Sequence, residues 1–192
     1  MKILYHHRTA SKDGQAVHIE EMIEALRAQG HQVRVVAPGQ SDDKAGQMGG
    51  DVGWVHRLKD LMPKAAYELM ELAYSWVAYR KLMAAAKEFR PDVIYERYNL
   101  YLLAGVMAKR SLGLPLLLEI NAPLVYERAQ HSGGLALPAL ARWAEGKAWR
   151  TADKVLPVTE VLADHVRAYG VQDDRIVVIP NGINEAHFAH AP

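Results

Sequence analysis

The sequence has 192 residues, half of them hydrophobic and 23% charged, with 23 basic and 22 acidic side chains and a formal net charge of +1. This composition excludes a disordered or fibrous protein and predicts one globular domain with a single core. The balanced charge gives no reason to expect nucleic acid as a partner, because such binding depends on many contacts between basic side chains and phosphates.

The numbers of cysteines and histidines and the lengths of the apolar stretches exclude further kinds of site and location. The chain has no cysteine, which excludes disulfides and thiolate metal sites and favours a reducing compartment such as the cytoplasm. Its nine histidines lack the spacing of metal ligands, so we expect no metal. The longest apolar stretch, residues 100–108, is too short to cross a bilayer, and the N-terminus lacks the apolar region of a signal peptide.

The N-terminal part of the chain predicts a strand, a helix and a second strand. Residues 3–5 form a short apolar run, and apolar residues recur at helical spacing over 17–30, where the final glycine suits the end of a helix. Residues 33–36 are rich in valine and predict a strand. A linker rich in Gly, Asp and Ser follows over 39–50, and then a weak strand over 52–56.

The rest of the chain continues this alternation. A long helix is predicted over 63–89, because strong helix formers fill it and prolines bound it. The remaining elements are strands over 93–95, 116–120, 154–158 and 176–179, which alternate with helices over 100–112, 135–150 and 161–169. Such alternation predicts an α/β protein, a Rossmann-like doubly wound and mostly parallel sheet that forms one domain over 1–192.

Ligands of such folds bind at the carboxyl ends of the strands, so the loops there are the candidate site. The loop over 8–15 precedes a helix, whose amides and dipole could hold a phosphate with help from Lys12; the other interpretation is a simple turn around Gly14. The loop lacks the three glycines of a dinucleotide-binding motif, which disfavours a nicotinamide-dependent dehydrogenase.

Polar side chains also crowd the ends of two later strands. Glu96, Arg97, Tyr98 and Asn99 follow one of them and form either a binding site or an exposed ion pair with a helix cap. Glu119 lies at the end of another strand, among apolar residues. Because an unpaired buried carboxylate is costly, we expect Glu119 to have a partner such as Arg97 or a backbone amide.

The long helix is more aromatic than one packed side requires. Tyr67, Tyr74 and Trp76 lie near Arg80, a combination that suits a membrane surface. The commoner explanation for such a stripe is a helix packed on the sheet, whose Tyr and Lys side chains reach out to solvent.

Several segments share the order and spacing of motifs from one known family. They are Gly14 with His18, residues 26–35, PDVI at 91–94, residues 114–118, and VVIPNGINEAHF at 177–188. Together they resemble the N-terminal half of glycosyltransferase family four, whose retaining enzymes have the GT-B fold. The last segment is the most specific, because it is similar to the run that joins the two halves of these enzymes.

The resemblance implies that this chain is the Rossmann-like, acceptor-side half of a GT-B enzyme, with the C-terminal donor-binding domain absent from it. In the family, a sugar passes from a nucleotide-sugar donor to an acceptor such as a sugar or lipid, with no metal or other cofactor implied. We expect the isolated half to be inactive, and the enzyme to be cytoplasmic with possible peripheral contact with the membrane.

The resemblance also assigns roles to single residues. The donor-phosphate loop would comprise Lys12, Asp13, Gly14 and Gln15. The acceptor would be bound by His18, Glu96, Arg97, Tyr98, Asn99, Glu127 and Arg128. Asn181 and Gly182 would form the hinge between the domains. Asn121 stands where the family often has a histidine facing the reaction centre; an amide cannot act as a base, so we expect it to orient a hydroxyl group.

The alternative hypothesis is a non-catalytic binding module of the same fold. Such a module would act at a membrane surface or on a protein partner through the aromatic helix, and it would not transfer sugar.

Overall fold

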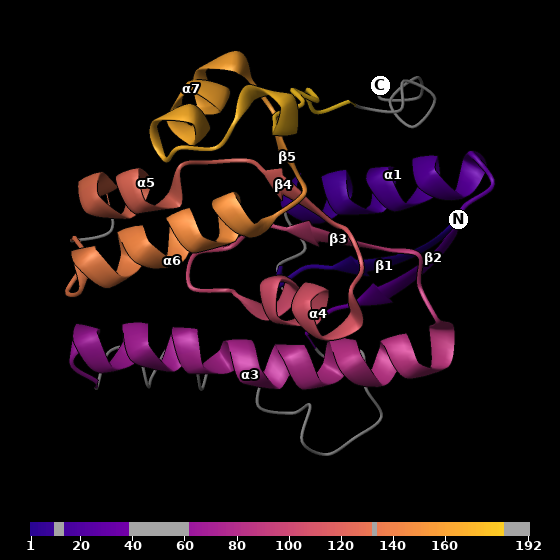
Figure 1. The fold of residues 1–192 in the computed structure, drawn as a ribbon. Coiled ribbons are helices and arrows are strands. Elements are labelled where there is room, and N and C mark those ends of the chain that lie inside the picture. Colours follow the sequence, from indigo (N-terminus) through magenta and orange to yellow (C-terminus); the bar gives the residue numbers. More distant parts are fainter. Residues whose placement is uncertain (10–13, 39–61, 132–133, 183–192) are drawn as a thin grey trace, which may run out of the picture.

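The computed structural model describes residues 1–9, 14–38, 62–131 and 134–182. In this part of the chain five parallel strands form one sheet, in the order β2-β1-β3-β4-β5 (Figure 1). The strands are β1 (Lys2–His6), β2 (Gln32–Val36), β3 (Val93–Arg97), β4 (Leu116–Ile120) and β5 (Lys154–Pro157). The predicted α/β, Rossmann-like parallel sheet is therefore confirmed.

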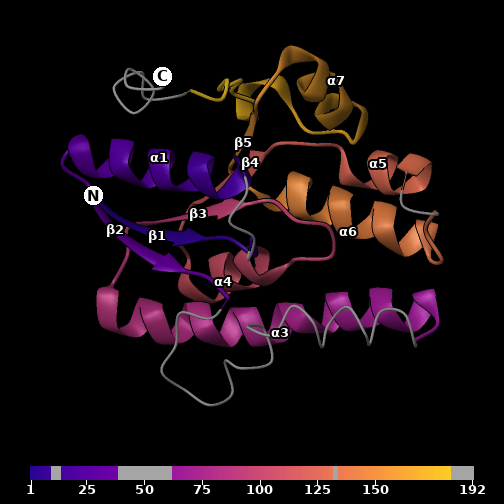
Figure 2. The same cartoon turned by 180° about the vertical axis from the view of Figure 1, so that it is seen from behind.

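Helices cover both faces of the sheet, α1 lying on one side and α3 with α4 on the other (Figures 1 and 2). The helices are α1 (Gly14–Ala28), α3 (Lys64–Phe89), α4 (Ala104–Leu112), α5 (Leu124–His131), α6 (Pro138–Thr151) and α7 (Glu160–Ala168), with a short 3-10 helix at Asp173–Arg175. A parallel sheet needs this double cover, because its strands are apolar on both faces.

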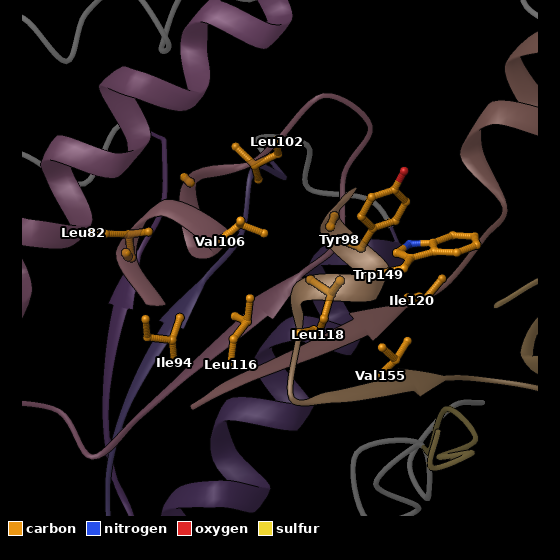
Figure 3. Close-up of a cluster of buried hydrophobic side chains, with 14 of the residues drawn as sticks. Leu82, Ile94, Tyr98, Leu102, Val106, Leu116, Leu118, Ile120, Trp149 and Val155 are labelled. Carbon is orange, nitrogen blue, oxygen red and sulfur yellow. The ribbon is translucent and has the colours of Figure 1, made fainter. Parts of the chain in front are cut away.

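The larger core lies on the side of α3, α4 and α6. Figure 3 shows Leu82 of α3, Val106 of α4 and Trp149 of α6 converging on the apolar strand residues Ile94 and Leu118. All five side chains are buried, and Trp149 is completely so. Burial of this apolar surface is the dominant stabilising term for such a fold.

A smaller core lies under α1. Ile19 and Ile23 of this helix pack against the strand side chains that face it. Among these, the rings of Tyr5 and Tyr95 stack with centroids 5.0 Å apart and an angle of 10° between their planes. The two tyrosines belong to neighbouring strands and lie just before the carboxyl ends of β1 and β3. Their stacked rings therefore support the region where ligands bind in such sheets.

Some element boundaries differ from the prediction. Residues 124–131 form α5, although the sequence predicted no element between the strand over 116–120 and the helix over 135–150. Pro123 precedes this helix and accepts a hydrogen bond from the Glu127 amide at 3.0 Å. Helix α4 begins at Ala104 because residues 100 and 101 form a turn, in which Tyr101 has a φ of 66°.

The predicted last strand is also different. Ile176 makes only an isolated parallel bridge to Val155 of β5, so the segment lies beside the sheet edge without forming a strand. The predicted linker over 39–50 and the weak strand over 52–56 lie outside the described residues.

The sheet order fixes where a ligand can bind. The chain passes from β1 to β2 on one side of β1, and β3 later pairs with β1 on its other side. The connections that follow β1 and β3 therefore run in opposite directions along the sheet. At such a switch point the loops after the two strands separate and leave a crevice at the carboxyl edge of the sheet.

Candidate functional site

A cavity of about 470 Å³ opens at this switch point. Its lining comes from the loops after β1, β3 and β4, from α1 and α5, and from the C-terminal segment. The lining residues are Arg8, Thr9, His18, Arg97, Tyr98, Asn99, Asn121, Ala122, Leu124, Glu127, Arg128 and Asn181. Segments far apart in the sequence thus meet around one hollow, because the parallel strands all end at the same edge.

The carboxylate of Glu119 organises one wall of the cavity. Arg97 and Glu119 are register partners in β3 and β4, and Arg97 Nη1 donates to Glu119 Oε1 at 2.9 Å. Asn121 Nδ2 donates to the same oxygen at 2.6 Å, and the Tyr95 hydroxyl donates to Oε2 at 2.9 Å. His18 Nε2 lies 3.3 Å from Oε1. The expectation that Glu119 has a partner such as Arg97 is confirmed.

These contacts decide the charge state of Glu119. The residue is only 3% exposed, and burial alone would raise the pKa of its carboxyl. Contacts with His18, Asn121 and Arg97 outweigh burial and hold this pKa below its usual range. Glu119 is therefore an anion at neutral pH, and its negative charge fixes the orientation of the donors around it.

The contact with Glu119 leaves one atom of Asn121 available to a ligand. A carboxylate can only accept hydrogen bonds, so the amide nitrogen of Asn121 must face Glu119. The amide oxygen Oδ1 is buried and has no hydrogen-bond partner among the described residues. Because Asn121 lines the cavity, this oxygen can accept a hydrogen bond from a hydroxyl group of a bound molecule.

A second buried carboxylate, Glu71 of α3, holds the opposite wall. Arg128 of α5 binds it with two hydrogen bonds, from Nη1 to Oε2 at 2.7 Å and from Nη2 to Oε1 at 3.0 Å. Burial would lower the pKa of Arg128, but the hydrogen bonds and charge of Glu71 outweigh it and raise that pKa. Arg8, from the loop after β1, places its Nη1 3.5 Å from the same Oε1.

Glu68, one helical turn before Glu71, anchors the chain that surrounds this wall. It accepts hydrogen bonds from the Tyr101 hydroxyl at 2.8 Å and from the backbone amides of Ala136 and Leu137 at 2.7 and 2.9 Å. The turn after β3 and the connection before α6 are both tied to α3 in this way.

Most of the residues proposed from the sequence meet at the cavity. They are His18, Arg97, Tyr98, Asn99, Asn121, Glu127, Arg128 and Asn181. Gly182 lines a neighbouring hollow that also includes His18. Gly14 and Gln15 begin α1, whereas Lys12 and Asp13 lie outside the described residues.

Glu96 does not line the cavity, which corrects its expected role in acceptor binding. Successive residues of a strand point to opposite faces, so Glu96 points towards α4 while Arg97 points towards α1. Glu96 is 1% exposed; its Oε2 lies 2.5 Å from His6 Nδ1 and accepts a hydrogen bond from the Gly105 amide at 2.9 Å. Glu96 therefore links the end of β3 to the end of β1 and to α4.

Glu71 was not among the residues proposed from the sequence, and Arg8 was included only as the first residue of the loop over 8–15. A signal for Glu71 was present, because the buried face of α3 comprises Glu68, Glu71, Ser75, Ala78, Leu82 and Ala86 at helical spacing. Two carboxylates on an otherwise apolar stripe require buried partners, and this requirement could have directed attention to the arginines.

The described residues include no group of three or more His, Asp or Glu side chains placed to hold a metal ion. No described helix has the length and apolar character needed to cross a membrane.

Comparisons with known proteins identify the fold and the family. The family model of the glycosyl transferase 4-like domain matches residues 13–182. No curated protein matches the sequence significantly.

Solved structures with a similar fold include HepE, a glycosyltransferase and an epimerase. HepE from Anabaena, in complex with UDP-glucose, is 18% identical with a TM-score of 0.60, over 96% of this chain and 44% of that protein. A glycosyltransferase from Rickettsia africae is 16% identical with a TM-score of 0.53, over 100% and 46%. A UDP-GlcNAc 2-epimerase from Neisseria meningitidis, bound to UDP-GlcNAc, is 13% identical with a TM-score of 0.53, over 93% and 45%.

These likenesses show the fold: the chain corresponds to one Rossmann-like half of a GT-B architecture and spans less than half the length of the matched structures.

Proposed function

Because this chain belongs to the glycosyl transferase 4-like domain family, we propose that it is the acceptor-binding half of a retaining glycosyltransferase. The enzyme transfers a hexose from a nucleotide sugar to an acceptor in cytoplasmic carbohydrate biosynthesis. The donor is held mainly by a second domain, so the 192-residue chain is inactive alone. Nucleotide sugars bound to HepE and to the epimerase support this class of donor.

The observation that carries the proposal is the cavity at the β1/β3 switch point. Its polar groups are held by buried anions, as the Arg97 and Asn121 contacts with Glu119 illustrate. A preorganised set of donors and acceptors of this kind suits the hydroxyl groups of a sugar-like acceptor, because little conformational freedom is lost on binding.

In the proposed reaction the cavity orients the acceptor, and the leaving group takes the proton. A second hydroxyl group of the acceptor donates to Asn121 Oδ1, and this hydrogen bond aligns the oxygen of the attacking hydroxyl towards the anomeric carbon of the donor. The bond between that carbon and the nucleotide phosphate breaks, the bond to the acceptor oxygen forms on the same face, and the hydroxyl proton passes to the departing phosphate. Asn121 cannot take this proton, and the scheme requires no metal.

The test is a transfer assay with labelled nucleotide sugars, performed on this chain alone and on the chain together with the donor-binding half that the proposal requires. We expect transfer only from the pair, with the anomeric configuration of the donor kept in the product as measured by NMR. Transfer by this chain alone would contradict its inactivity, and an inverted product would contradict retention.

Paired variants test the role of the cavity. Arg97→Ala removes a cavity side chain, and Arg110→Ala removes an exposed arginine at the end of α4 as a matched control. We expect the first change to lower transfer at least tenfold and the second to leave it unchanged. Equal activities in the two folded variants would show that the acceptor binds elsewhere.

A peripheral membrane contact is a second candidate function, favoured by the exposed face of α3. Leu69, Met70, Trp76 and Val77 are between 39% and 55% exposed there. Tyr74 is not part of this face, because its ring packs against the core and lies 4.9 Å from the Arg8 guanidinium. An exposed apolar surface next to basic residues can bind an anionic bilayer.

Vesicle flotation tests this second candidate. The double variant Trp76→Ser with Val77→Ser removes two apolar side chains, and Val161→Ser on α7 removes a comparably exposed one elsewhere. We expect the wild type and the Val161 variant to float with anionic vesicles and the double variant to remain in the lower fraction. A wild type that stays below would contradict membrane contact while leaving the glycosyltransferase proposal intact.

A further inference from the structure

We propose that Arg8 and Arg128 form a phosphate-binding subsite in the wall of the cavity. Both side chains line it, although they come from the loop after β1 and from α5. Their guanidinium groups approach the same oxygen of Glu71, with Arg8 Nη1 at 3.5 Å and Arg128 Nη2 at 3.0 Å from Oε1. The two cations therefore lie side by side.

The charges of this pair are only partly compensated. One carboxylate, Glu71, faces two guanidinium groups, whereas Arg97 on the other wall has Glu119 as its own counterion. Glu127 is the one acidic residue in the described lining, and it is exposed, so solvent screens its charge. The region between Arg8 and Arg128 therefore attracts an anion.

Arg8 also has a buried nitrogen that can donate a hydrogen bond to a ligand. Its Nη1 is buried and has no hydrogen-bond acceptor among the described residues, since the contact with Glu71 is too long for a good bond. A buried donor without an acceptor is unfavourable. An oxyanion placed against this nitrogen supplies the acceptor and gains a charge-assisted hydrogen bond.

Aromatic rings hold both guanidinium groups in place. Arg8 lies 4.9 Å from the centroid of the Tyr74 ring, and Arg128 lies 5.9 Å from that of Tyr101. Tyr101 is itself fixed by its hydrogen bond to Glu68. Guanidinium groups held in this way keep their remaining N–H groups oriented, and a phosphate group has enough oxygens to accept from both arginines at once.

Two molecules could supply the phosphate: an acceptor with a phosphate group, or the diphosphate of the nucleotide sugar. The assignment to the acceptor rests on the proposed function, in which this half binds the acceptor. The subsite itself depends only on Arg8, Arg128 and Glu71.

Titration of the chain with inorganic phosphate tests the subsite, using calorimetry on the wild type, Arg8→Gln and the exposed control Arg110→Gln. We expect saturable binding by the wild type, at least tenfold weaker binding by the Arg8 variant and less than a twofold change in the control. Equal affinities of the two folded variants, or no saturable binding by the wild type, would overturn the subsite.

A measurement on the unaltered protein guards against misfolding of the variant. In the wild type, phosphate should shift the side-chain Nε–Hε NMR signals of Arg8 and Arg128 and leave that of Arg110 in place. Signals of Arg8 and Arg128 that do not move at saturating phosphate would also overturn the proposal.

Glycerol 3-phosphate and UDP then distinguish the two sources. If Arg8→Gln weakens only glycerol 3-phosphate, the subsite serves an acceptor phosphate; if it weakens UDP, the subsite serves the donor. Both results support the subsite, and an unchanged affinity for both ligands contradicts it. If the chain binds phosphate but does not transfer sugar when paired with the donor-binding half, that result counts against the proposed function alone. If the pair transfers sugar but the chain does not bind phosphate, that result counts against the subsite alone.

Discussion

Asn121 and Arg97 donate hydrogen bonds to the same oxygen of Glu119, at 2.6 and 2.9 Å. One anion thus orients a neutral and a charged side chain that both line the cavity. This hydrogen bond restricts the rotation of the Asn121 amide and so fixes the direction of its oxygen. Preorganisation of this kind is what a site needs to position a hydroxyl group for reaction.

Asn121→Asp should destabilise the protein and prevent acceptor binding. The new carboxylate would face the ionised Glu119, and the donor at 2.6 Å would be lost. We expect a loss of about 1–3 kcal/mol in the free energy of unfolding at pH 7, measured with urea. The loss should shrink towards pH 4, where the new carboxyl can be protonated and donate again. A loss that does not change with pH would show that repulsion between the carboxylates is not its cause.

Gly105→Ala should destabilise the fold through Glu96. A Cβ at position 105 would lie 2.7 Å from Cδ and from both carboxylate oxygens of Glu96, a buried side chain that His6 also contacts. Overpacking of this kind costs about 1–3 kcal/mol. Gly182→Ala is the matched control, because nothing lies within 4 Å of its added carbon. Similar midpoints of thermal unfolding for the two variants would contradict the close packing around Glu96.

Glu145→Gln should make the protein more stable than the wild type as the pH rises. Burial raises the pKa of Glu145, although hydrogen bonds from Tyr169, Tyr98 and the Val125 amide partly oppose it. A raised pKa in the folded state means that the contribution of this group to stability is present below the usual glutamate pKa of about 4.3 and is lost as the pH rises through the folded value. Glutamine does not ionise and keeps an acceptor oxygen.

The measurement is the free energy of unfolding of both proteins between pH 4 and pH 8. We expect the difference, variant minus wild type, to increase with pH and then to level off. A constant difference would mean that Glu145 has the same pKa in the folded and unfolded states.

His7→Gln should remove part of the acid sensitivity of the fold. Burial, together with the charges of His6 and Arg97, lowers the pKa of His7 from 6.5 to about 4. A lowered pKa means that the unfolded chain binds a proton first, so stability falls as the pH decreases from 6.5 towards 4. The thermal midpoint of the variant should fall less steeply over this range than that of the wild type. Parallel curves would contradict a buried neutral His7.

Much of the architecture could be predicted because short sequence patterns indicate where its helices and strands begin and end. The strand over 116–120 matches β4 at both ends, and the helix over 63–89 matches α3 apart from its first residue. A proline directly precedes both β4 and α3, and the helix is filled by strong helix formers. Helix α5 was missed because eight polar-rich residues after Pro123 carry no clear apolar period.

The site could be predicted only where strand order determines it. The ends of parallel strands share an edge, so Arg97 and Asn121 could be placed near one another from the sequence. The pairing of Glu71 with Arg128 joins residues 57 positions apart on two helices, and no local pattern encodes that contact. Successive side chains of β3 point to opposite faces of the sheet. The position of the strand's end did not show which face Glu96 would take.

The two backbone amides that donate to Glu68 have a consequence for the dynamics of the connection before α6. Ala136 and Leu137 lie outside any helix, where amide hydrogens normally exchange quickly with solvent, yet they are bonded to a carboxylate that is 4% exposed. Their exchange requires this segment to separate from α3, so it should be as slow as that of the helix itself. Ala136 and Leu137 should therefore exchange together with α3, although Glu68 lies 68 and 69 positions before them in the chain.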